Sequence, residues 1–279
     1  MTTSLQLGVI HEPLLIFGGP YSNYQAMQAL LQVVEQRGIP SQRVICTGDV
    51  VAYCAEPEAT TRLLRESGMP VVKGNCEQSL AANAADCGCG FEAGSSCDVL
   101  TDSWYPFARQ HLSAESKAWM AALPDAIHVE MQGRTFLVVH GSVSQINRFV
   151  FASSPRQDKR AELARAGVDC VIAGHCGIPF GQQVGNKFWL NAGAIGMPAN
   201  DGTRDGWYLL LEPVEQGVQA SWHRLRYDAP AACAAMRQAG LANGYADALL
   251  SGHWPSMDVL PAGERQRQGE AIHLPAMQF

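Results

Sequence analysis

Two short apolar runs that each end in a histidine beside a glycine constrain this chain more than any other feature. They read Val138-Val139-His140-Gly141 and Val171-Ile172-Ala173-Gly174-His175. β-Branched residues favour buried strands, and open α/β folds bind ligands at the carboxyl ends of their strands. The two imidazoles are therefore predicted to lie together at the edge of a sheet, which is typical of metal chemistry.

The same pattern occurs earlier in the chain, where apolar runs lead into Gly48-Asp49 and Gly74-Asn75. Four strand ends thus offer Asp49, Asn75, His140 and His175. One carboxylate, one amide oxygen and two imidazoles suit a divalent transition metal (Fe, Mn or Zn) with open positions for water and substrate. Each residue alone is equally well explained as a turn or cap residue, but four at successive strand ends favour one shared site.

The hydrophobic pattern predicts a chain that begins with repeated strand and helix units. Expected strands cover 14–17, 43–47 and 69–73, and expected helices cover 24–36, 58–68 and 77–85. Such units imply parallel strands with right-handed crossovers. The stretch 86–103, rich in Gly, Cys, Ser and Asp, breaks the rhythm and reads as an ordered loop or insertion.

The second half of the chain mixes hairpins with helices. We expect helices at 104–111, at 114–123 with Ser113 as the N-cap, and at 156–166. A hairpin of strands 126–131 and 135–139 leads to His140, and strand 170–173 leads to His175. Strands at 180–184, 188–191, 206–211 and 220–225 are expected to form a second, antiparallel sheet. Helices at 230–240 and 245–250 complete a domain over 1–252, followed by a C-terminal tail at 253–279, either poorly ordered or packed on a partner.

Composition narrows the classes of protein and partner. With 279 residues, 47% hydrophobic and 16% charged, the chain can bury a full core. A formal net charge of -6 disfavours a nucleic-acid duplex as partner but allows a small phosphate ester beside a metal. No apolar run approaches the roughly 20 residues that span a bilayer, and no export signal is recognisable, so no membrane partner and a cytoplasmic location are expected.

Nine cysteines are unusual for such a chain. Reduced thiols are expected, because the number is odd and the chain is large enough to fold without disulfides. Cys46, Cys170 and Cys233 are interpreted as core residues. The other six lie in glycine-rich or polar stretches and are candidate additional metal ligands or redox groups: Cys54, Cys76, Cys87, Cys89, Cys97 and Cys176.

The order and spacing of these blocks over residues 14–228 resemble the calcineurin-like metallophosphoesterases, in particular their small bacterial phosphodiesterases. The matching blocks are Gly48-Asp49, Gly74-Asn75-Cys76-Glu77, His140-Gly141, Gly174-His175-Cys176-Gly177 and Asn191-Ala192-Gly193-Ala194-Ile195-Gly196. The resemblance implies an α/β (α+β) sandwich of two mixed sheets flanked by helices, with metals at the strand ends. It also implies that Asp49, Asn75, His140 and His175 hold one metal, with Asp49 and His140 taking part in catalysis.

The departures from the family pattern fall on the other metal of the usual pair. Where the resemblance implies an Asp, a His and a final His, this chain has Gly19, Tyr21 and Gly177, while Asn23 survives as a substrate contact. Cys76 stands where the family has its catalytic histidine. Tyr21 or the loop cysteines could replace the missing ligands, and Cys87, Cys89 and Cys97 could form a separate metal or cluster site.

Three functions remain open from the sequence. The first is hydrolysis of a phosphomonoester or phosphodiester by one or two metal ions, with a small phosphorylated molecule as partner and Cys76 acting on the substrate. The second is metal- and cysteine-dependent chemistry on a different substrate, and the third is a non-catalytic metal-binding sensor. Arg148 and Arg204 are candidate phosphate contacts, and a homo-oligomer is compatible with the sequence.

Overall fold

Two mixed β-sheets packed face to face form the centre of the molecule. The computed structural model describes residues 3–90, 94–241 and 244–279. One sheet has the strand order β1-β4-β5-β6-β8-β7 and the other β11-β10-β9-β2-β3. The strands of the first are β1 (Ser4–Val9), β4 (Ala126–Met131), β5 (Arg134–Val139), β6 (Cys170–Ala173), β7 (Phe180–Val184) and β8 (Lys187–Asn191). Those of the second are β2 (Leu14–Phe17), β3 (Val44–Cys46), β9 (Gly206–Val214), β10 (Gly217–Leu225) and β11 (Met277–Gln278).

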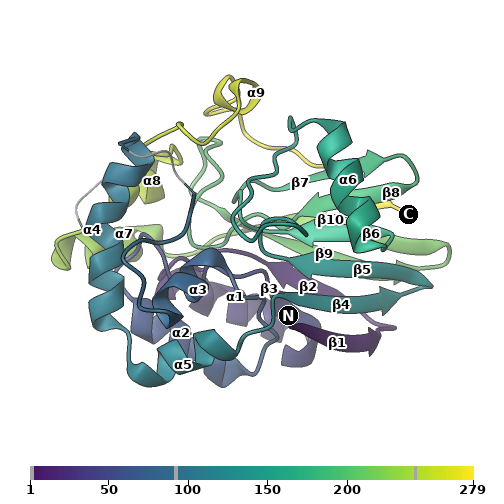
Figure 1. Ribbon diagram of the computed structural model, residues 1–279, viewed down its shortest axis with the longest axis horizontal. Helices are drawn as coiled ribbons and strands as arrows, with labels where there is room; N and C mark the ends of the chain where they lie inside the picture. The colour runs from purple at the N-terminus through teal and green to yellow at the C-terminus, as the bar shows by residue number, and fades with distance from the viewer. Residues whose placement is uncertain (1–2, 91–93, 242–243) are drawn as a thin grey trace.

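The helices cover the outer faces and one end of this sandwich. In Figure 1 most of them gather on the left, the strands extend to the right, and α6 lies across β6 and β8. They are α1 (Tyr24–Arg37), α2 (Pro57–Ser67), α3 (Asn75–Ala81), α4 (Ser96–His111), α5 (Ala114–Ala122), α6 (Arg156–Ala166), α7 (Ala229–Gln238), α8 (Gly244–Ser251) and α9 (Ala262–Arg265), with a 3-10 turn at Ser41–Arg43. The predicted sandwich of two mixed sheets flanked by helices is confirmed.

Alternation of side chains explains the layers. In β2, Leu14 and Ile16 belong to the core between the sheets, whereas Leu15 and Phe17 belong to the core shared with α1 and α2. In β5, Phe136 and Val138 face the core between the sheets in the same way, and Leu137 packs on the side of α6. Because successive side chains point to opposite faces, uniformly apolar strands such as these must be covered on both sides.

Helix ends follow the expected chemistry. The Asn23 side chain accepts a hydrogen bond from the Ala26 amide at the start of α1, and Ser113 does the same for Ser116 in α5. The glycine after α2, Gly68, adopts the left-handed conformation with a φ of 70°. These local signals position the loops that leave the strands.

Several expectations about the elements were wrong. β7 and β8 do not join β9 and β10 in a second sheet but extend the first sheet through β6. The strand expected at 69–73 is reduced to a single parallel bridge between Cys46 and Val71. Helix α4 begins at Ser96, inside the stretch expected to be a loop.

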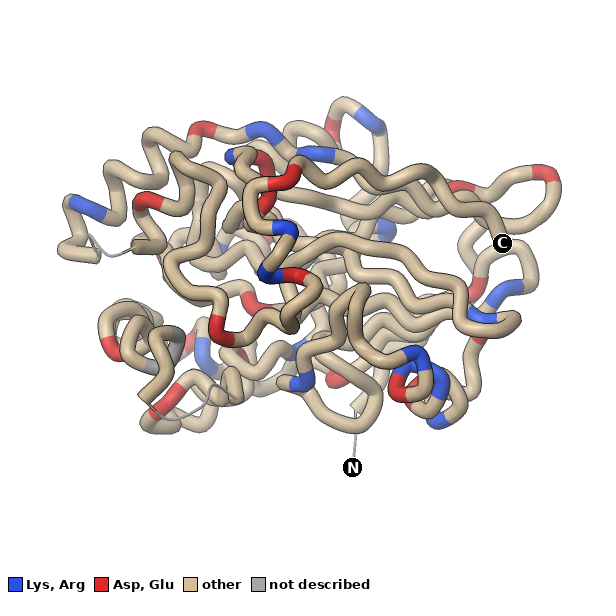
Figure 2. The backbone as a smooth tube through the Cα atoms, turned by 90° about the horizontal axis from the view of Figure 1, so that it is seen from above, with Lys and Arg blue, Asp and Glu red and all other residues tan. Residues whose placement is uncertain are grey.

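The ends of the chain join the sheets. β1 was missed in the sequence, and it pairs in parallel with β4. After residue 252 the chain passes through α9, and β11 then pairs with β10. In the part of the chain that is described, none of the helices is long and apolar enough to cross a membrane. Basic and acidic positions are interspersed along the backbone (Figure 2).

Candidate metal centre and adjoining pocket

Four side chains, from the loops after β3, β5 and β6 and from the start of α3, converge on one point. His140 Nε2 lies 3.0 Å from Asn75 Oδ1, 2.9 Å from His175 Nδ1 and 3.2 Å from Asp49 Oδ2. His175 Nδ1 lies 3.7 Å from the same Asp49 oxygen. All four residues are buried. The structure therefore brings together the whole ligand set predicted for one metal ion.

The donor set fits a cation better than it fits hydrogen bonding alone. His140 Nδ1 contacts the Thr47 carbonyl oxygen at 2.7 Å, so this nitrogen carries a proton and donates it. The other ring nitrogen, Nε2, then faces an amide oxygen, a carboxylate oxygen and a second imidazole nitrogen. One N–H cannot point at three acceptors, because hydrogen bonds are directional. A divalent ion among these atoms would be coordinated by all of them.

The charges of the protein alone compensate one another at this point. Burial opposes ionisation of Asp49, but the attraction of His140 outweighs it and holds the pKa of the carboxyl well below its ordinary value. Burial also opposes protonation of His140, yet the Asp49 carboxylate raises the pKa of this imidazole. Burial lowers the pKa of His175. A metal ion bound here would supply positive charge beside the Asp49 carboxylate, and metal binding to such ligands releases protons.

The loop that carries Asp49 is shaped by a glycine and fixed by a glutamate. Gly48 has a φ of 97°, and a Cβ there would lie 2.9 Å from His140 Nδ1, so the turn demands glycine. The buried Glu77 carboxylate accepts hydrogen bonds from the amides of Asp49 and Val50, both at 2.8 Å, and of Gly74 at 2.9 Å. Glu77 therefore ties the Asp49 loop to the Asn75 loop. In the sequence it stood only as the last residue of the matching block Gly74-Asn75-Cys76-Glu77, with no role assigned.

Asn75 is oriented by the cysteine-rich stretch. Its Nδ2 donates to the Cys87 carbonyl oxygen at 3.0 Å, to Cys89 Sγ at 3.3 Å and to Cys76 Sγ at 3.5 Å. With the amide nitrogen engaged on this side, Oδ1 faces His140. The outer neighbours of a metal ligand commonly set its orientation in this way. This part of the insertion thus packs against the metal centre.

The predicted cysteine ligands occupy different places. Cys87 and Cys89 are joined by a disulfide, which corrects the expectation of reduced thiols throughout. Cys54 donates to the Gly196 carbonyl oxygen and Cys176 to that of Ile178. No cysteine sulfur joins the group formed by Asp49, His140 and His175 among the residues described. The side chain of Cys97 lies outside the described part of the structure.

The half of the site expected to hold the second metal is filled by an aromatic ring. A Cβ on Gly19 would lie 2.3 Å from Cζ of Tyr21, and a Cβ on Gly177 would lie 3.5 Å from the Tyr21 hydroxyl. The Tyr21 ring therefore occupies space that side chains at both glycines would enter. Burial, followed by the nearby Asp49 charge, raises the pKa of Tyr21 well above its ordinary value, so the phenol is neutral. Of these three residues, Tyr21 alone has a side chain with an oxygen that could reach a metal ion.

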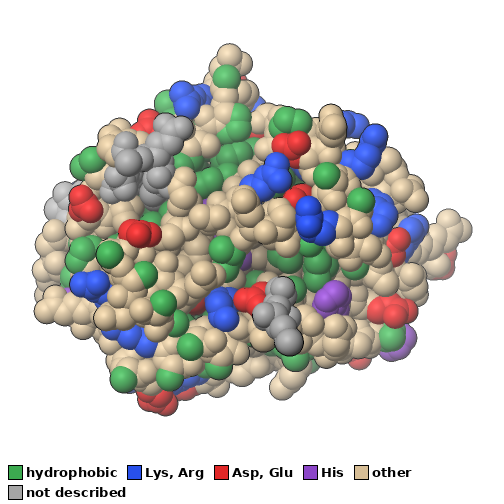
Figure 3. Space-filling view, viewed as in Figure 1, with side chains coloured by type: hydrophobic (Ala, Val, Ile, Leu, Met, Phe, Trp, Pro, Cys, Tyr) green, Lys and Arg blue, Asp and Glu red, His purple; other side chains and the backbone are tan. Residues whose placement is uncertain are grey.

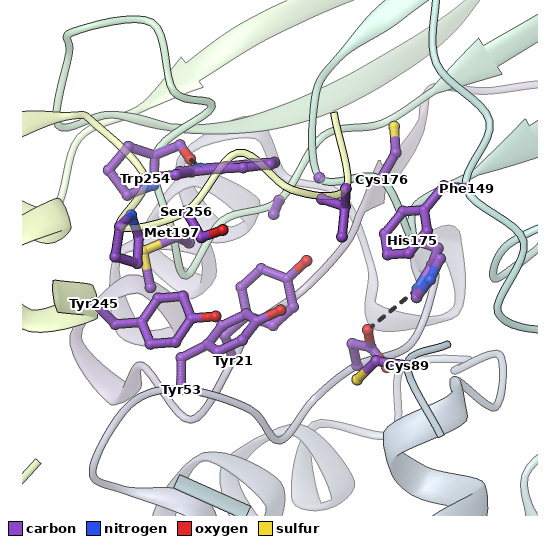
Figure 4. Close-up of a pocket in the computed structure, with 16 residues that line it drawn as sticks. Tyr21, Tyr53, Cys89, Phe149, His175, Cys176, Met197, Tyr245, Trp254 and Ser256 are labelled. Atoms are coloured by element: carbon purple, nitrogen blue, oxygen red, sulfur yellow. Dashed lines mark hydrogen bonds and ion pairs between the residues drawn. The ribbon is translucent and has the colours of Figure 1, made fainter. Parts of the chain in front are cut away.

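A pocket opens from the metal centre on this side. Its wall includes Asp49 and His175 from the centre. The space next to them is surrounded by aromatic side chains: Tyr21, Tyr53, Tyr245, Phe149 and Trp254 (Figure 4). Phe149 also packs on the His175 ring, with 4.1 Å between ring centroids. The space-filling view shows hydrophobic side chains lining a hollow below the projecting α9 segment (Figure 3). Phe149 lies in the loop that follows His140-Gly141, but its own contribution was not recognised in the sequence, and Trp254 comes from a segment far from the ligand blocks.

The other residues predicted to act on substrate lie outside the pocket wall. Cys76 is buried behind Asn75, and Cys89 reaches the wall instead. The Asn23 side chain caps α1 and donates to the Gly196 carbonyl oxygen at 2.9 Å. Arg148 pairs with Asp158 at 2.9 Å and with Glu162 at 3.4 Å. Arg204 donates to the Leu250 carbonyl oxygen at 2.8 Å.

Comparisons with known proteins agree with this geometry. The family model of the calcineurin-like phosphoesterase superfamily domain matches residues 10–215. An uncharacterized protein of Methanocaldococcus jannaschii, MJ0912, is 23% identical over 225 residues, which cover 75% of this chain and 85% of that protein.

Two solved structures share the fold. A metallophosphoesterase from Sphaerobacter thermophilus superposes with a TM-score of 0.66 at 20% identity, covering 87% of this chain and 100% of the other. A hypothetical protein from Pyrococcus horikoshii, PH1004, gives a TM-score of 0.72 at 15% identity, covering 88% and 99% of the two chains. At these identities the likeness concerns the fold alone.

Proposed function

Because the chain belongs to the calcineurin-like phosphoesterase superfamily, we propose that it hydrolyses phosphoesters at a single metal centre held by Asp49, Asn75, His140 and His175. The observation that carries this proposal is the convergence of the four ligand atoms at the base of a pocket. Mixed nitrogen and oxygen ligands favour Fe, Mn or Zn. A bound ion would activate water and neutralise charge on a phosphoryl oxygen.

The residues of the metal centre and of the pocket would have different roles. His140 and Asn75 lie behind the centre, and Thr47, Cys87 and Cys89 fix their orientation. Asp49 and His175 form the part of the centre that reaches the pocket wall, so the phosphoryl group would approach from their side. Phe149, which packs on the His175 ring, and the tyrosines of the pocket wall would exclude water from the remaining space. A small phosphorylated molecule is the substrate that such a pocket accepts.

The test combines metal analysis with a panel of phosphomonoesters and phosphodiesters. We expect about one metal ion per chain, hydrolysis of at least one ester, and loss of both in His140→Ala. Turnover should fall by more than about 10³-fold, because a metal ion supplies several kcal/mol of transition-state stabilisation. His128→Ala, in β4, is the matched control and should retain metal and activity. Bound metal without hydrolysis of any ester would overturn the proposal in favour of a sensor.

One observation favours cysteine-dependent chemistry as a second candidate. Cys89 lines the pocket, is paired with Cys87 and lies 3.3 Å from the amide nitrogen of Asn75. A redox group this close to a metal ligand could act on a substrate in the same pocket. Replacing both cysteines by serine separates the candidates, because phosphoester turnover that survives the double change would exclude this alternative for that reaction.

A further inference from the structure

The aromatic side chains beside the metal centre form a structured wall. Tyr53 stacks on Tyr245 with 4.3 Å between ring centroids, and Tyr21 meets Tyr53 edge to face at 4.9 Å. Figure 4 shows the three rings on one side of the pocket, with their hydroxyl oxygens directed toward the side of His175 and Cys89. Trp254 lies on another side of the same space, above the tyrosines in this view.

The backbone holds this wall in an unusual conformation. Tyr21 has a φ of 52° and Tyr53 a φ of 46°. Bulky side chains rarely adopt the left-handed region, and such residues concentrate at functional sites. The Tyr21 amide donates to the Asp49 carbonyl oxygen at 3.2 Å, and the Cys54 amide donates to the Tyr21 carbonyl oxygen at 3.2 Å. The aromatic wall and the metal-ligand loop are therefore joined by the same hydrogen bonds.

Trp254 is fixed on the other side. Its indole Nε1 donates to the Pro198 carbonyl oxygen at 2.6 Å, and its backbone amide donates to Asn200 Oδ1 at 2.8 Å. A Cβ on Gly177 would lie 3.7 Å from the Trp254 ring and 3.5 Å from the Tyr21 hydroxyl, so this glycine keeps the space next to both rings open. The rings thus border a space that begins at the metal centre.

The charges around this space limit what can enter it. Of the described residues that line the pocket, none is a lysine or an arginine. Asp49 and His175 are the ionisable groups of the centre that line the pocket, and burial raises the pKa of the Tyr21 and Tyr53 phenols well above the ordinary value. A second phosphate or a carboxylate on the substrate would find no cation here. Pockets lined by aromatic rings with a few polar groups suit flat, uncharged parts of a ligand.

We propose that this pocket binds an uncharged aromatic group attached to the phosphoryl group of the substrate, and that Trp254 and the tyrosine wall select for it. The inference rests on the proposed function, since the phosphoryl group is placed at the metal centre. Tyr21, which stands where the family pattern has a metal ligand, would thereby have a role in substrate recognition.

The test measures binding of two phosphonate monoesters to the metal-loaded protein by calorimetry. Methyl phenylphosphonate and methyl cyclohexylphosphonate carry the same charge and similar apolar bulk, but only the first has a flat, aromatic ring. Aromatic stacking should make the phenyl compound bind about 3- to 10-fold more tightly. Trp254→Leu should abolish this difference, whereas Trp254→Phe and the distant Trp119→Leu in α5 should preserve it.

Equal binding of the two compounds, binding of neither, or a preference unchanged in Trp254→Leu would overturn the inference. Its failure is distinct from failure of the proposed function. If the protein hydrolyses phosphoesters without preferring the phenyl compound, only the proposed aromatic site is wrong. If it prefers the phenyl compound but hydrolyses no ester, the aromatic site stands and the proposed function is wrong.

Discussion

The two halves of the site differ in the side chains that their loops present. On one side, the loops after β3, β5 and β6 and the start of α3 present Asp49, His140, His175 and Asn75, with their ligand atoms within hydrogen-bonding distance of one another or slightly farther apart. On the other side, Gly19 and Gly177 present no side chain, and the Tyr21 ring fills the space between them. One half is built to hold positive charge, and the other is apolar.

The comparison shows that Tyr21 and Gly19 fit together in the apolar half. Without the ring a cavity would remain beside the glycine, and a buried cavity is destabilising. Here the tyrosine that stands in place of one ligand packs over the glycine that stands in place of another. The metal half is held by its own orienting contacts, which come from Glu77, Thr47 and the cysteines.

The largest expected effect comes from removing the ring that fills the apolar half. Tyr21→Ala should lower the free energy of unfolding by about 3–5 kcal/mol, because it leaves a cavity next to Gly19 and Gly177. Tyr21→Phe keeps the ring and should cost less than about 1.5 kcal/mol. Denaturant unfolding measures both, and metal analysis should still find about one ion per chain. Loss of metal in Tyr21→Phe would show that the phenol is a ligand and would break the comparison.

A smaller effect is expected from the support of the metal half. Glu77→Gln removes a charged acceptor from three backbone amides that hold the Asp49 and Asn75 loops. Changes to such outer contacts typically reduce metal affinity by about 10- to 100-fold, which chelator competition can measure.

The matched control for Glu77 is Glu58, which accepts hydrogen bonds from Ser113 and Ser116 at the start of α5. Glu58→Gln should lower stability without changing metal affinity. Equal losses of metal affinity in both variants would mean that the effect is general destabilisation, and Glu77 would have no special connection to the metal half.

The metal half was predictable from sequence because its signals are local. A buried strand followed by Gly and a polar residue places that residue at a sheet edge wherever the strand lies. Glu77 was not recognised as a clamp, since its acceptor role depends on a loop 28 residues earlier in the chain. The aromatic half was read as missing ligands, because only the three-dimensional structure shows where the Tyr21 ring points.

The parts of the fold that could be predicted were likewise those whose sequence signals are local. Helices such as α2, with Pro57 at its start and Gly68 at its end, were placed within a residue or two. The sheet to which β7 and β8 belong was wrong, because an antiparallel pair can extend either sheet and the choice depends on packing. β1 escaped notice although Leu5, Leu7 and Val9 alternate in the pattern of a strand, because its residues are mostly exposed and form no buried apolar run.

The smallest effect is expected from the arginines once predicted to contact phosphate. Arg148 is held by Asp158 and Glu162, and Arg204 by the Leu250 carbonyl oxygen, so neither is part of the pocket wall. Replacing either by glutamine should change KM for any hydrolysed ester by less than about twofold, as for other surface changes of about 0.5 kcal/mol. Steady-state kinetics of the metal-loaded variants, compared with Trp254→Leu, give the measurement. A tenfold rise in KM that grows at low ionic strength would instead mean that charge selects the substrate, because screening is weakest there. Substrate recognition would then depend on charges outside the apolar half of the site.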